Sequence, residues 1–302
     1  MRLIDPIRYV KLKASGRLPS PKGSALSIIK LLQQDNYKID DLVRLVKSDP
    51  AIAGELLRFS NSASHGHRKP IISISDAITT LGARQVGLIV TAFSILSDHR
   101  HGTCPEFDYE RFWSRALVSA ISAQAFAGYS KYNEEECFTA GLLCNLGELA
   151  LASIFPQRYG EIISITNYAD QIRLGLEREA FGNDHRELNA TLLLDWGLPL
   201  EMVTAIYFCE DPYEDFSQAG SRTHSLTLVL HLALAFADIC VADDAKRKSM
   251  LPSLFDNAAR LGINPREIYS IGELIISNWN DWGVQLKILT HKFDLALNSD
   301  PQ

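Results

Sequence analysis

The sequence predicts an all-α fold for a soluble globular protein, and three observations support this prediction. Apolar residues recur at three- and four-residue spacing along most of the chain, which is the period of a helix buried on one face. The alternating patterns of half-buried strands are nearly absent. Ser, Asp and Pro residues, which are typical of helix N-termini, stand where several apolar runs begin. With 302 residues and 46% hydrophobic content, the chain is long enough to bury a sizeable core.

The N-terminal part of the chain predicts several short helices. Apolar periodicity places the first two clear helices over about 24–33 and 40–47. Asp49 can cap a third helix that begins at Pro50, because proline is well tolerated in the first helical turn. This helix is expected to end near Asn61.

A glycine separates the next two predicted helices. Ser73 and Asp76 form a capping-box pattern that opens one of them, and Gly82 divides it from another over about 83–96. A helix, a glycine turn and a helix can form a DNA-reading motif. Here the second helix, ARQVGLIVTAFSIL, leaves few side chains for phosphates or bases, so we interpret it as core. A DNA-binding regulator would depend on the turn at Leu81-Gly82 alone.

The remainder of the chain also predicts helices, interrupted by one polar loop. This loop, CEDPYEDFSQAGSRTH, is the best candidate for a domain boundary. It lacks a long Gly/Ser or Pro tract, so we expect residues 1–302 to form a single all-α unit. The expected helices cover about 108–129, 134–154, 157–180, 185–196, 200–208 and 225–241, followed by two or three C-terminal helices, one of which begins after Pro265.

Charge and cysteine usage limit the classes of partner. Thirty Lys and Arg residues against 36 Asp and Glu residues give a net charge of −6, and a surface of that sign repels nucleic-acid phosphates unless a basic stripe overrides it. The strongest basic run, Lys246–Lys248, follows two aspartates and is typical of a solvated loop. The five cysteines contain no Cys-x-x-Cys pair, so neither a disulfide framework nor a zinc ribbon is predicted.

Neither export nor a membrane span is predicted. The N-terminus, MRLIDPIRYV, lacks an apolar region of signal-peptide length. The most apolar stretch, Leu226 to Val241, is shorter than the roughly 20 residues that cross a bilayer, and it contains His231 and Asp238. We therefore expect a cytoplasmic protein without membrane contact, in which this stretch is a central buried helix.

Two polar residues are predicted to face inward from apolar helices. His185 shares a helix face with the leucines of HRELNATLLLDW, a position typical of a hydrogen-bonded core histidine unless other ligands converge on it. Asp238 shares a face with His231 and Leu234. A carboxylate on a buried face needs a cation, a metal or a hydrogen-bond donor, because burying an unpaired charge costs several kcal/mol.

Several segments follow one another in an order that is characteristic of a known family. The N-terminal half contains LPSPKGSALSIIKLLQQ, SDPAIAGELLRFSNSA and ISISDAITTLG, and later come RFWSRALVSAISAQAF and GLLCNLGE. This order resembles the HDOD branch of the HD superfamily of metal-dependent phosphohydrolases, a bacterial signalling domain. The resemblance implies an HD-like helical bundle with an additional N-terminal helical subdomain, an HDOD core over 18–241 and a C-terminal helical extension over 242–302. The family-signature positions are Asp49, Pro50, Asn61, Ser62 and Gly82.

The resemblance also implies that the metal pocket of the enzymes has lost most of its ligands. Catalytic members place a His-Asp pair where this chain has Cys144-Asn145, and a histidine where it has Arg115. A hydrolytic metal site normally needs three or more ligands and a position for water, whereas only His185 and Asp238 keep ligand types. Cys209-Glu210 falls where the enzymes have histidines. The implied vestigial pocket consists of Arg115, Cys144, Asn145, His185, Cys209, Glu210 and Asp238.

The positive charge of Arg115 can itself replace the metal. A guanidinium is always protonated, and pairing with Asp238 or Glu148 would satisfy the pocket without an ion. Cys144 is expected to act as a small hydrophobe, because no neighbouring residue in the sequence supplies a base to activate it. Asp49 and Asn61 are better explained as a helix cap and a turn residue than as a binding surface.

These interpretations predict a non-enzymatic output or scaffolding module of bacterial signal transduction. It would bind a signalling protein, or a small ligand in the vestigial pocket, and would use no metal or other cofactor. The alternative is a metal-dependent phosphohydrolase with an altered ligand set, in which Glu148 or Glu210 joins His185 and Asp238.

Overall fold

The structure of the chain is a computed structural model, and the residues that it describes are helical or irregular, with no strand among them. This confirms the predicted all-α class. At positions 84, 88, 170, 171 and 285 only the backbone is described. The described residues are 1–32, 34, 36–61, 70–166, 170–212, 220–293 and 295.

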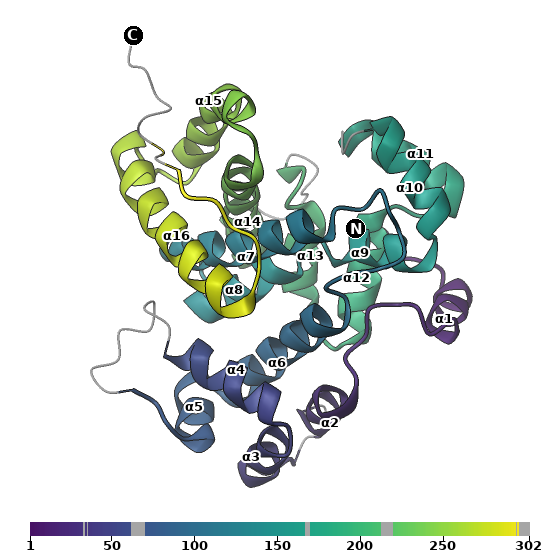
Figure 1. Cartoon of the computed structure of the whole chain (residues 1–302), viewed down its shortest axis with the longest axis vertical. Coiled ribbons are helices and arrows are strands. Elements are labelled where there is room, and N and C mark those ends of the chain that lie inside the picture. Colours follow the sequence, from purple (N-terminus) through teal and green to yellow (C-terminus); the bar gives the residue numbers. More distant parts are fainter. Residues whose placement is uncertain are drawn as a thin grey trace. The chain divides into compact units, whose positions relative to one another are not determined.

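The packing of the helices divides the chain into two compact units (Figure 1). The smaller unit is Pro19–Arg100, which corresponds to the expected N-terminal helical subdomain. The larger unit joins Met1–Leu18 to His101–Gln302. This division is finer than the single unit over 1–302 expected from the sequence, in which no Gly/Ser or Pro tract marks a junction. The core over 18–241 and the extension over 242–302 stay predictions.

The smaller unit is built from helices whose apolar faces pack together. They are α2 (Gly23–Leu32), α3 (Ile39–Lys47), α4 (Pro50–Ser60), α5 (Ile74–Leu81) and α6 (Ala83–Asp98). α2 packs on α3 and α6, and α4 packs on α3, α5 and α6. The predicted caps are present: an Asp49 oxygen accepts hydrogen bonds from the backbone N–H groups of Ala51 and Ile52 at 3.1 and 3.2 Å, and the Ser73 hydroxyl accepts one from Asp76 at 3.0 Å.

Gly82 joins α5 to α6 in a conformation that favours glycine. Its φ of 85° lies in a region that L-residues with side chains rarely adopt. On α6, Val86, Ile89 and Val90 are each no more than 1% exposed. The second helix of the glycine turn therefore packs into the core of the unit, as the sequence predicts, and does not present these residues to a nucleic acid.

Asn61 fastens the end of α4 to the segment that leads into α5. Its amide nitrogen donates to the carbonyl oxygens of Leu57 at 2.8 Å and Ile71 at 2.7 Å, and its amide oxygen accepts from the N–H group of Ile71 at 2.7 Å. The side chain thus pairs with both backbone groups of Ile71. This explains Asn61 as a turn residue, whereas the neighbouring signature residue Ser62 lies outside the described residues.

Replacing Asn61 is expected to destabilise the smaller unit. Asn61→Ala removes three hydrogen bonds near the surface and should lower the free energy of unfolding by about 1–2 kcal/mol. Asn61→Asp keeps the acceptor for the Ile71 N–H but places a carboxylate oxygen against the carbonyl oxygens of Leu57 and Ile71, so its loss should be at least as large. Urea denaturation followed by circular dichroism measures both values. Equal stability of Asn61→Ala and the wild type would contradict the role of this side chain.

The larger unit is organised around one buried helix, α7 (Tyr109–Ala125), which packs against α8, α14 and α16 (Figure 1). Of the C-terminal helices, α15 packs on α14, α16 packs on α7, and the two pack on each other. The other elements of this unit are α1 (Pro6–Ala14), the 3₁₀ turn Ala127–Tyr129, α8 (Glu134–Leu143), α9 (Leu146–Ile154), α10 (Pro156–Thr166), α11 (Asp170–Phe181), α12 (His185–Asp195), α13 (Leu200–Phe208), α14 (Arg222–Val241), α15 (Asp244–Arg260) and α16 (Pro265–Leu286).

The helices of the larger unit differ from the prediction at one described break and at one missed helix. The helix expected over 134–154 is divided into α8 and α9. The helix expected over 157–180 corresponds to α10 and α11, and residues 167–169 between them lie outside the described residues. Apolar periodicity continues across the division between α8 and α9 and does not reveal it. The sequence analysis also missed α1, a nine-residue helix that Asp5 caps through the N–H of Arg8.

The segment Glu134–Ile154, which contains α8 and α9, and helix Arg222–Val241 are each long and apolar enough to cross a membrane by length and composition. In the structure, 89% of the apolar window in the first and 61% of that in the second is buried inside the protein. For α14, this burial agrees with the interpretation of its apolar sequence as a central helix, although the helix is four residues longer at its start than the stretch from Leu226.

Candidate functional site

The Cys144-Asn145 pair forms the turn that separates α8 from α9. The side-chain amide of Asn189, on α12, donates to the carbonyl oxygens of Leu143 at 3.1 Å and Cys144 at 2.5 Å. These carbonyls at the end of α8 therefore bond to another helix, which favours a break at this point. α9 then lies so close to α12 that a Cβ atom on Gly147 would be 1.9 Å from the carbonyl oxygen of His185.

Arg115 and Asp238 form a two-bonded ion pair between α7 and α14. The distances are 2.5 Å from Nε to Oδ1 and 3.2 Å from Nη2 to Oδ2, and the side chains are 17% and 32% exposed. Burial opposes the charge of the guanidinium, but the Asp238 carboxylate outweighs it and raises the pKa of Arg115. Two partners were expected for Arg115, Asp238 and Glu148, and in the structure it pairs with Asp238.

A second set of charged side chains, separate from the Arg115–Asp238 pair, is buried in the same unit. Glu148 on α9 accepts from Nη2 of Arg173 at 3.2 Å, and the same nitrogen is 3.5 Å from Nε2 of His185. His185 contacts Glu177 through Nδ1 at 2.7 Å and Glu210 through Nε2 at 3.2 Å. The side chains are at most 13% exposed. We call these residues the buried charge cluster: Glu148, Arg173, Glu177, His185 and Glu210.

The carboxylates of the cluster determine the charge state of its histidine. Burial lowers the pKa of His185, but the Glu177 and Glu210 carboxylates outweigh burial and raise this pKa well above its ordinary value. Burial likewise raises the pKa of Glu148 and Glu210, but Arg173 and His185 outweigh it and the net shift is downward for both carboxyl groups. These directions favour the charged forms of Glu148, Glu210 and His185.

The two cysteines of the implied pocket are buried beside the turn. Their sulfur atoms are 3.8 Å apart, and the thiols donate to helix carbonyls, Cys144 to Ala140 at 3.1 Å and Cys209 to Ile206 at 2.9 Å. The hydrogen bond to Cys144 and burial raise the pKa of Cys209 well above its ordinary value. The burial of the two thiols and their hydrogen bonds to helix carbonyls are typical of small core residues and not of nucleophiles.

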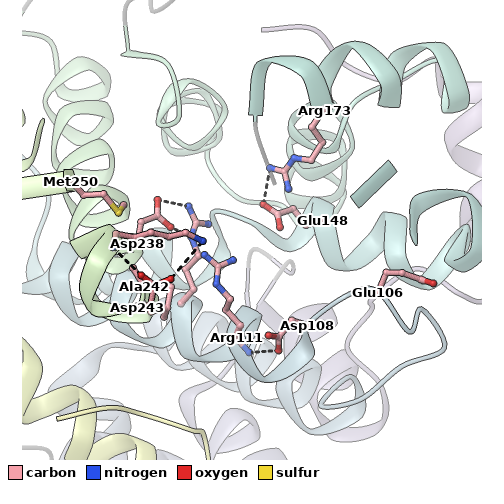
Figure 2. Close-up of a pocket in the computed structure, with 12 residues that line it drawn as sticks. Glu106, Asp108, Arg111, Glu148, Arg173, Asp238, Ala242, Asp243 and Met250 are labelled. Carbon is pink, nitrogen blue, oxygen red and sulfur yellow. Dashed lines mark hydrogen bonds and ion pairs between the residues drawn. The ribbon is translucent and has the colours of Figure 1, made fainter. Parts of the chain in front are cut away.

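A pocket of about 610 Å³ adjoins both charge groups. Figure 2 shows Glu148 and Arg173 pointing toward each other on one side, and Asp238, Asp243 and Met250 on another. Of the implied vestigial pocket, Arg115 and Asp238 line this cavity, whereas the other five members are not among its lining residues. The lining residues are Glu106, Asp108, Arg111, Arg115, Glu148, Arg173, Asp238, Val241, Ala242, Asp243, Lys246 and Met250.

The sequence analysis missed Arg173 and Glu177. Arg173 and Glu177 are spaced i, i+4 on α11, a pattern that is typical of a solvated ion pair on a helix surface. The side chains are instead 2% and 0% exposed. No local signal in DQIRLGLEREAF distinguishes this buried pair from an exposed one, because its burial depends on the packing of α11 in the folded unit.

The helical bundle and its charged pocket define an HD-related domain, and comparison with known proteins identifies the family. The family model described as HDOD domain matches residues 18–212. This chain belongs to the HDOD family, a branch of the HD superfamily. An uncharacterized protein of Treponema pallidum (strain Nichols) is 26% identical over 196 residues, which are 63% of this chain and 37% of that protein. The chain thus spans little more than a third of this relative.

Solved structures of related proteins agree with this assignment. The MmoQ response regulator of Methylococcus capsulatus (strain Bath) is 31% identical, with 84% of this chain and 96% of that chain covered and a TM-score of 0.52. A phosphohydrolase candidate from Shewanella amazonensis SB2B, at 23% identity, 91% and 97% coverage and a TM-score of 0.66, shows the shared fold. The family and these relatives fit a signalling or HD-related role.

The residues that the resemblance places at metal positions do not fit a divalent cation. Arg115 donates two hydrogen bonds to the Asp238 carboxylate, and the amide of Asn145 donates one to Glu148 at 3.5 Å. Among the described residues, one cluster has suitable atoms: Glu148, His185 and Glu210 each offer one within 4.8 Å of the others. The Arg173 guanidinium, which has no acceptor atom, already lies against two of these three residues.

A double-mutant cycle is expected to reveal strong coupling between Arg115 and Asp238. Arg115→Met or Asp238→Asn alone leaves one charge largely buried and should cost about 1–3 kcal/mol of unfolding free energy, given their partial exposure. The double variant should cost less than the sum, because neither charge remains. Urea denaturation of all four proteins measures the coupling. Additive losses would contradict a stabilising pair.

The contribution of His185 to stability is expected to fall at alkaline pH. Because its pKa is raised in the folded protein, the stabilisation is fully present below the unfolded value of about 6.5 and is lost as pH rises through the folded value. His185→Gln should therefore destabilise the protein most near pH 6 and progressively less toward pH 10. Urea denaturation across this range tests the trend, and an NMR titration of the imidazole gives the folded pKa directly. A midpoint at or below the ordinary value would contradict the charge state assigned to His185.

Proposed function

We propose that this protein is a non-enzymatic output or scaffolding module of cytoplasmic signal transduction in bacteria, which acts by binding a signalling protein or a small ligand. The observation that carries the proposal is the replacement of metal-site chemistry by guanidinium groups. Arg115 neutralises Asp238, and Arg173 neutralises Glu148. Both carboxylates are thus compensated by side chains of the protein itself.

A guanidinium does not supply the chemistry of a hydrolytic metal ion. A divalent cation lowers the pKa of a bound water and polarises the phosphoryl group, whereas a guanidinium binds no water as a ligand and stays protonated. The imidazole of the buried charge cluster, His185, lies between the carboxylates of Glu177 and Glu210, which raise its pKa. It is therefore a poor general base at neutral pH. These properties support binding in preference to turnover.

The 31% identity with a protein described as a response regulator supports a signalling partner. The pocket supports a small ligand as a further means of input, because charged groups of both signs surround an apolar wall formed by Val241, Ala242 and Met250. The volume of this pocket lies within the range of typical ligand sites, and nine of its twelve lining residues are charged, which suits a charged ligand.

One observation favours a second candidate function, a metal-dependent phosphohydrolase with an altered ligand set. Glu148, His185 and Glu210 bring ligand atoms within 4.8 Å of one another. This function requires Arg173 to leave its contact with Glu148, and it requires His185 to lose a proton. Both changes oppose the charge pairing of the cluster.

Metal content and turnover test the proposal against this alternative. We expect protein purified without chelator, after growth with added Mn and Fe, to contain far less than one metal ion per chain by elemental mass spectrometry. We also expect no hydrolysis of p-nitrophenyl phosphate or bis(p-nitrophenyl) phosphate above background in millimolar Mn²⁺. Near-stoichiometric metal that is lost in His185→Ala or Asp238→Ala, together with turnover, would overturn the proposal and establish the alternative.

A further inference from the structure

Arg173 lies against Glu148 and His185, two of the three residues that together offer metal-ligand atoms. We infer that Arg173 is the residue that excludes divalent cations from Glu148, His185 and Glu210, and that loss of its guanidinium converts this group into a site for one Mn²⁺-like ion. The inference rests on the proposed function, in which the wild-type pocket works without metal. Beyond that function, it identifies the one side chain whose charge keeps this cluster from binding a metal ion.

The ligand atoms already have suitable chemistry and spacing. Two carboxylate oxygens and one imidazole nitrogen are ligands that transition metals accept. Ligand bonds of about 2.0–2.2 Å allow two ligands of one ion to lie up to roughly 4.4 Å apart. The observed limit of 4.8 Å among the three atoms is close to this value, so small side-chain movements suffice.

The guanidinium occupies the space between two of these residues. Nη2 of Arg173 is 3.2 Å from an oxygen of Glu148 and 3.5 Å from Nε2 of His185. This nitrogen carries hydrogen atoms and no lone pair for a metal, so it competes with an ion for the same acceptors. The side chain is 2% exposed, which leaves it no solvated alternative without movement of the protein.

The charge balance of the cluster also depends on Arg173. Three carboxylates, those of Glu148, Glu177 and Glu210, face one guanidinium and one imidazole. Arg115, the next cation along the pocket, is held by two bonds to Asp238. Without Arg173, buried negative charge is left with too few partners, a situation that favours either proton uptake or capture of a cation.

Arg173 comes from a different helix than the candidate ligands. It projects from α11, whereas Glu148 lies on α9, His185 begins α12 and Glu210 follows α13. Helices α9, α12 and α13 pack in sequence, α9 on α12 and α12 on α13. A substitution at position 173 therefore removes the competing group while the ligand residues keep their positions on these packed elements.

The test is Mn²⁺ binding to the full chain with Arg173→Met, which keeps an unbranched side chain and removes the charge. The matched control is Arg178→Met on the same helix, whose guanidinium is 41% exposed and pairs with Asp184 and Glu187. We expect Arg173→Met to bind one Mn²⁺ per chain at least about tenfold more tightly than the wild type and Arg178→Met, by calorimetry and by electron paramagnetic resonance. Adding Glu210→Gln should abolish the gain.

The outcomes separate this inference from the proposed function. If the wild type is metal-free and Arg173→Met binds Mn²⁺ no better, the inference fails and the proposed function stands. If the wild type itself binds near-stoichiometric metal, the inference fails, and if that metal-loaded protein also hydrolyses phosphate esters, the proposed function fails with it. Arg173→Gln provides a second neutral variant, and a rise of its melting temperature in Mn²⁺ is expected. Unfolding of both variants even in millimolar Mn²⁺ also counts against the inference, because a cation in the cluster should restore the charge balance.

Discussion

The larger unit depends on the neutralisation of buried carboxylates by side chains of the same chain. Glu148 and Glu177 are almost fully buried, and Glu210 is 13% exposed. An ionised carboxylate in such a place costs several kcal/mol unless it is paired and hydrogen-bonded. Arg173 and His185 supply these partners, and Arg115 does the same for Asp238. This set of pairs lets helices that carry acidic residues pack in an apolar bundle.

The break between α8 and α9 places the acidic residue that this network needs. The run FTAGLLCNLGELALASIFP is apolar enough to form one long helix, but Asn189 binds carbonyls at the end of α8, and Gly147 permits close contact with the backbone of His185. α9 begins in contact with α12, and Glu148 in its first turn reaches Arg173. The polar Cys-Asn-Leu-Gly-Glu piece is thus explained by a turn and by charge pairing, without a catalytic role for the thiol.

Much of the fold could be predicted from the sequence because its signals are local. Asp49 and Ser73 determine helix ends through contacts within three residues, and Gly82 does so through its own backbone conformation. The pairing of Arg115 with Asp238 was one of two options that charge complementarity allowed. Arg173 could not be predicted, because an i, i+4 pair has the same sequence whether α11 is exposed or buried. The division of α8 from α9 depends on Asn189, 45 residues further along the chain, so periodicity alone did not reveal it.

In the proposed function guanidinium groups stand in place of a metal ion, and this difference changes what the pocket can do. A metal ion exchanges ligands and offers an open position to water, and its loading varies with the metal supply. A guanidinium is covalently part of the chain, keeps its charge across the physiological range and directs its donors in fixed directions. Because Arg115 and Arg173 engage their carboxylates with these donors, the charge of these pairs does not depend on the metal supply. This property is the basis on which we propose recognition, in preference to hydrolysis, as the role of the pocket.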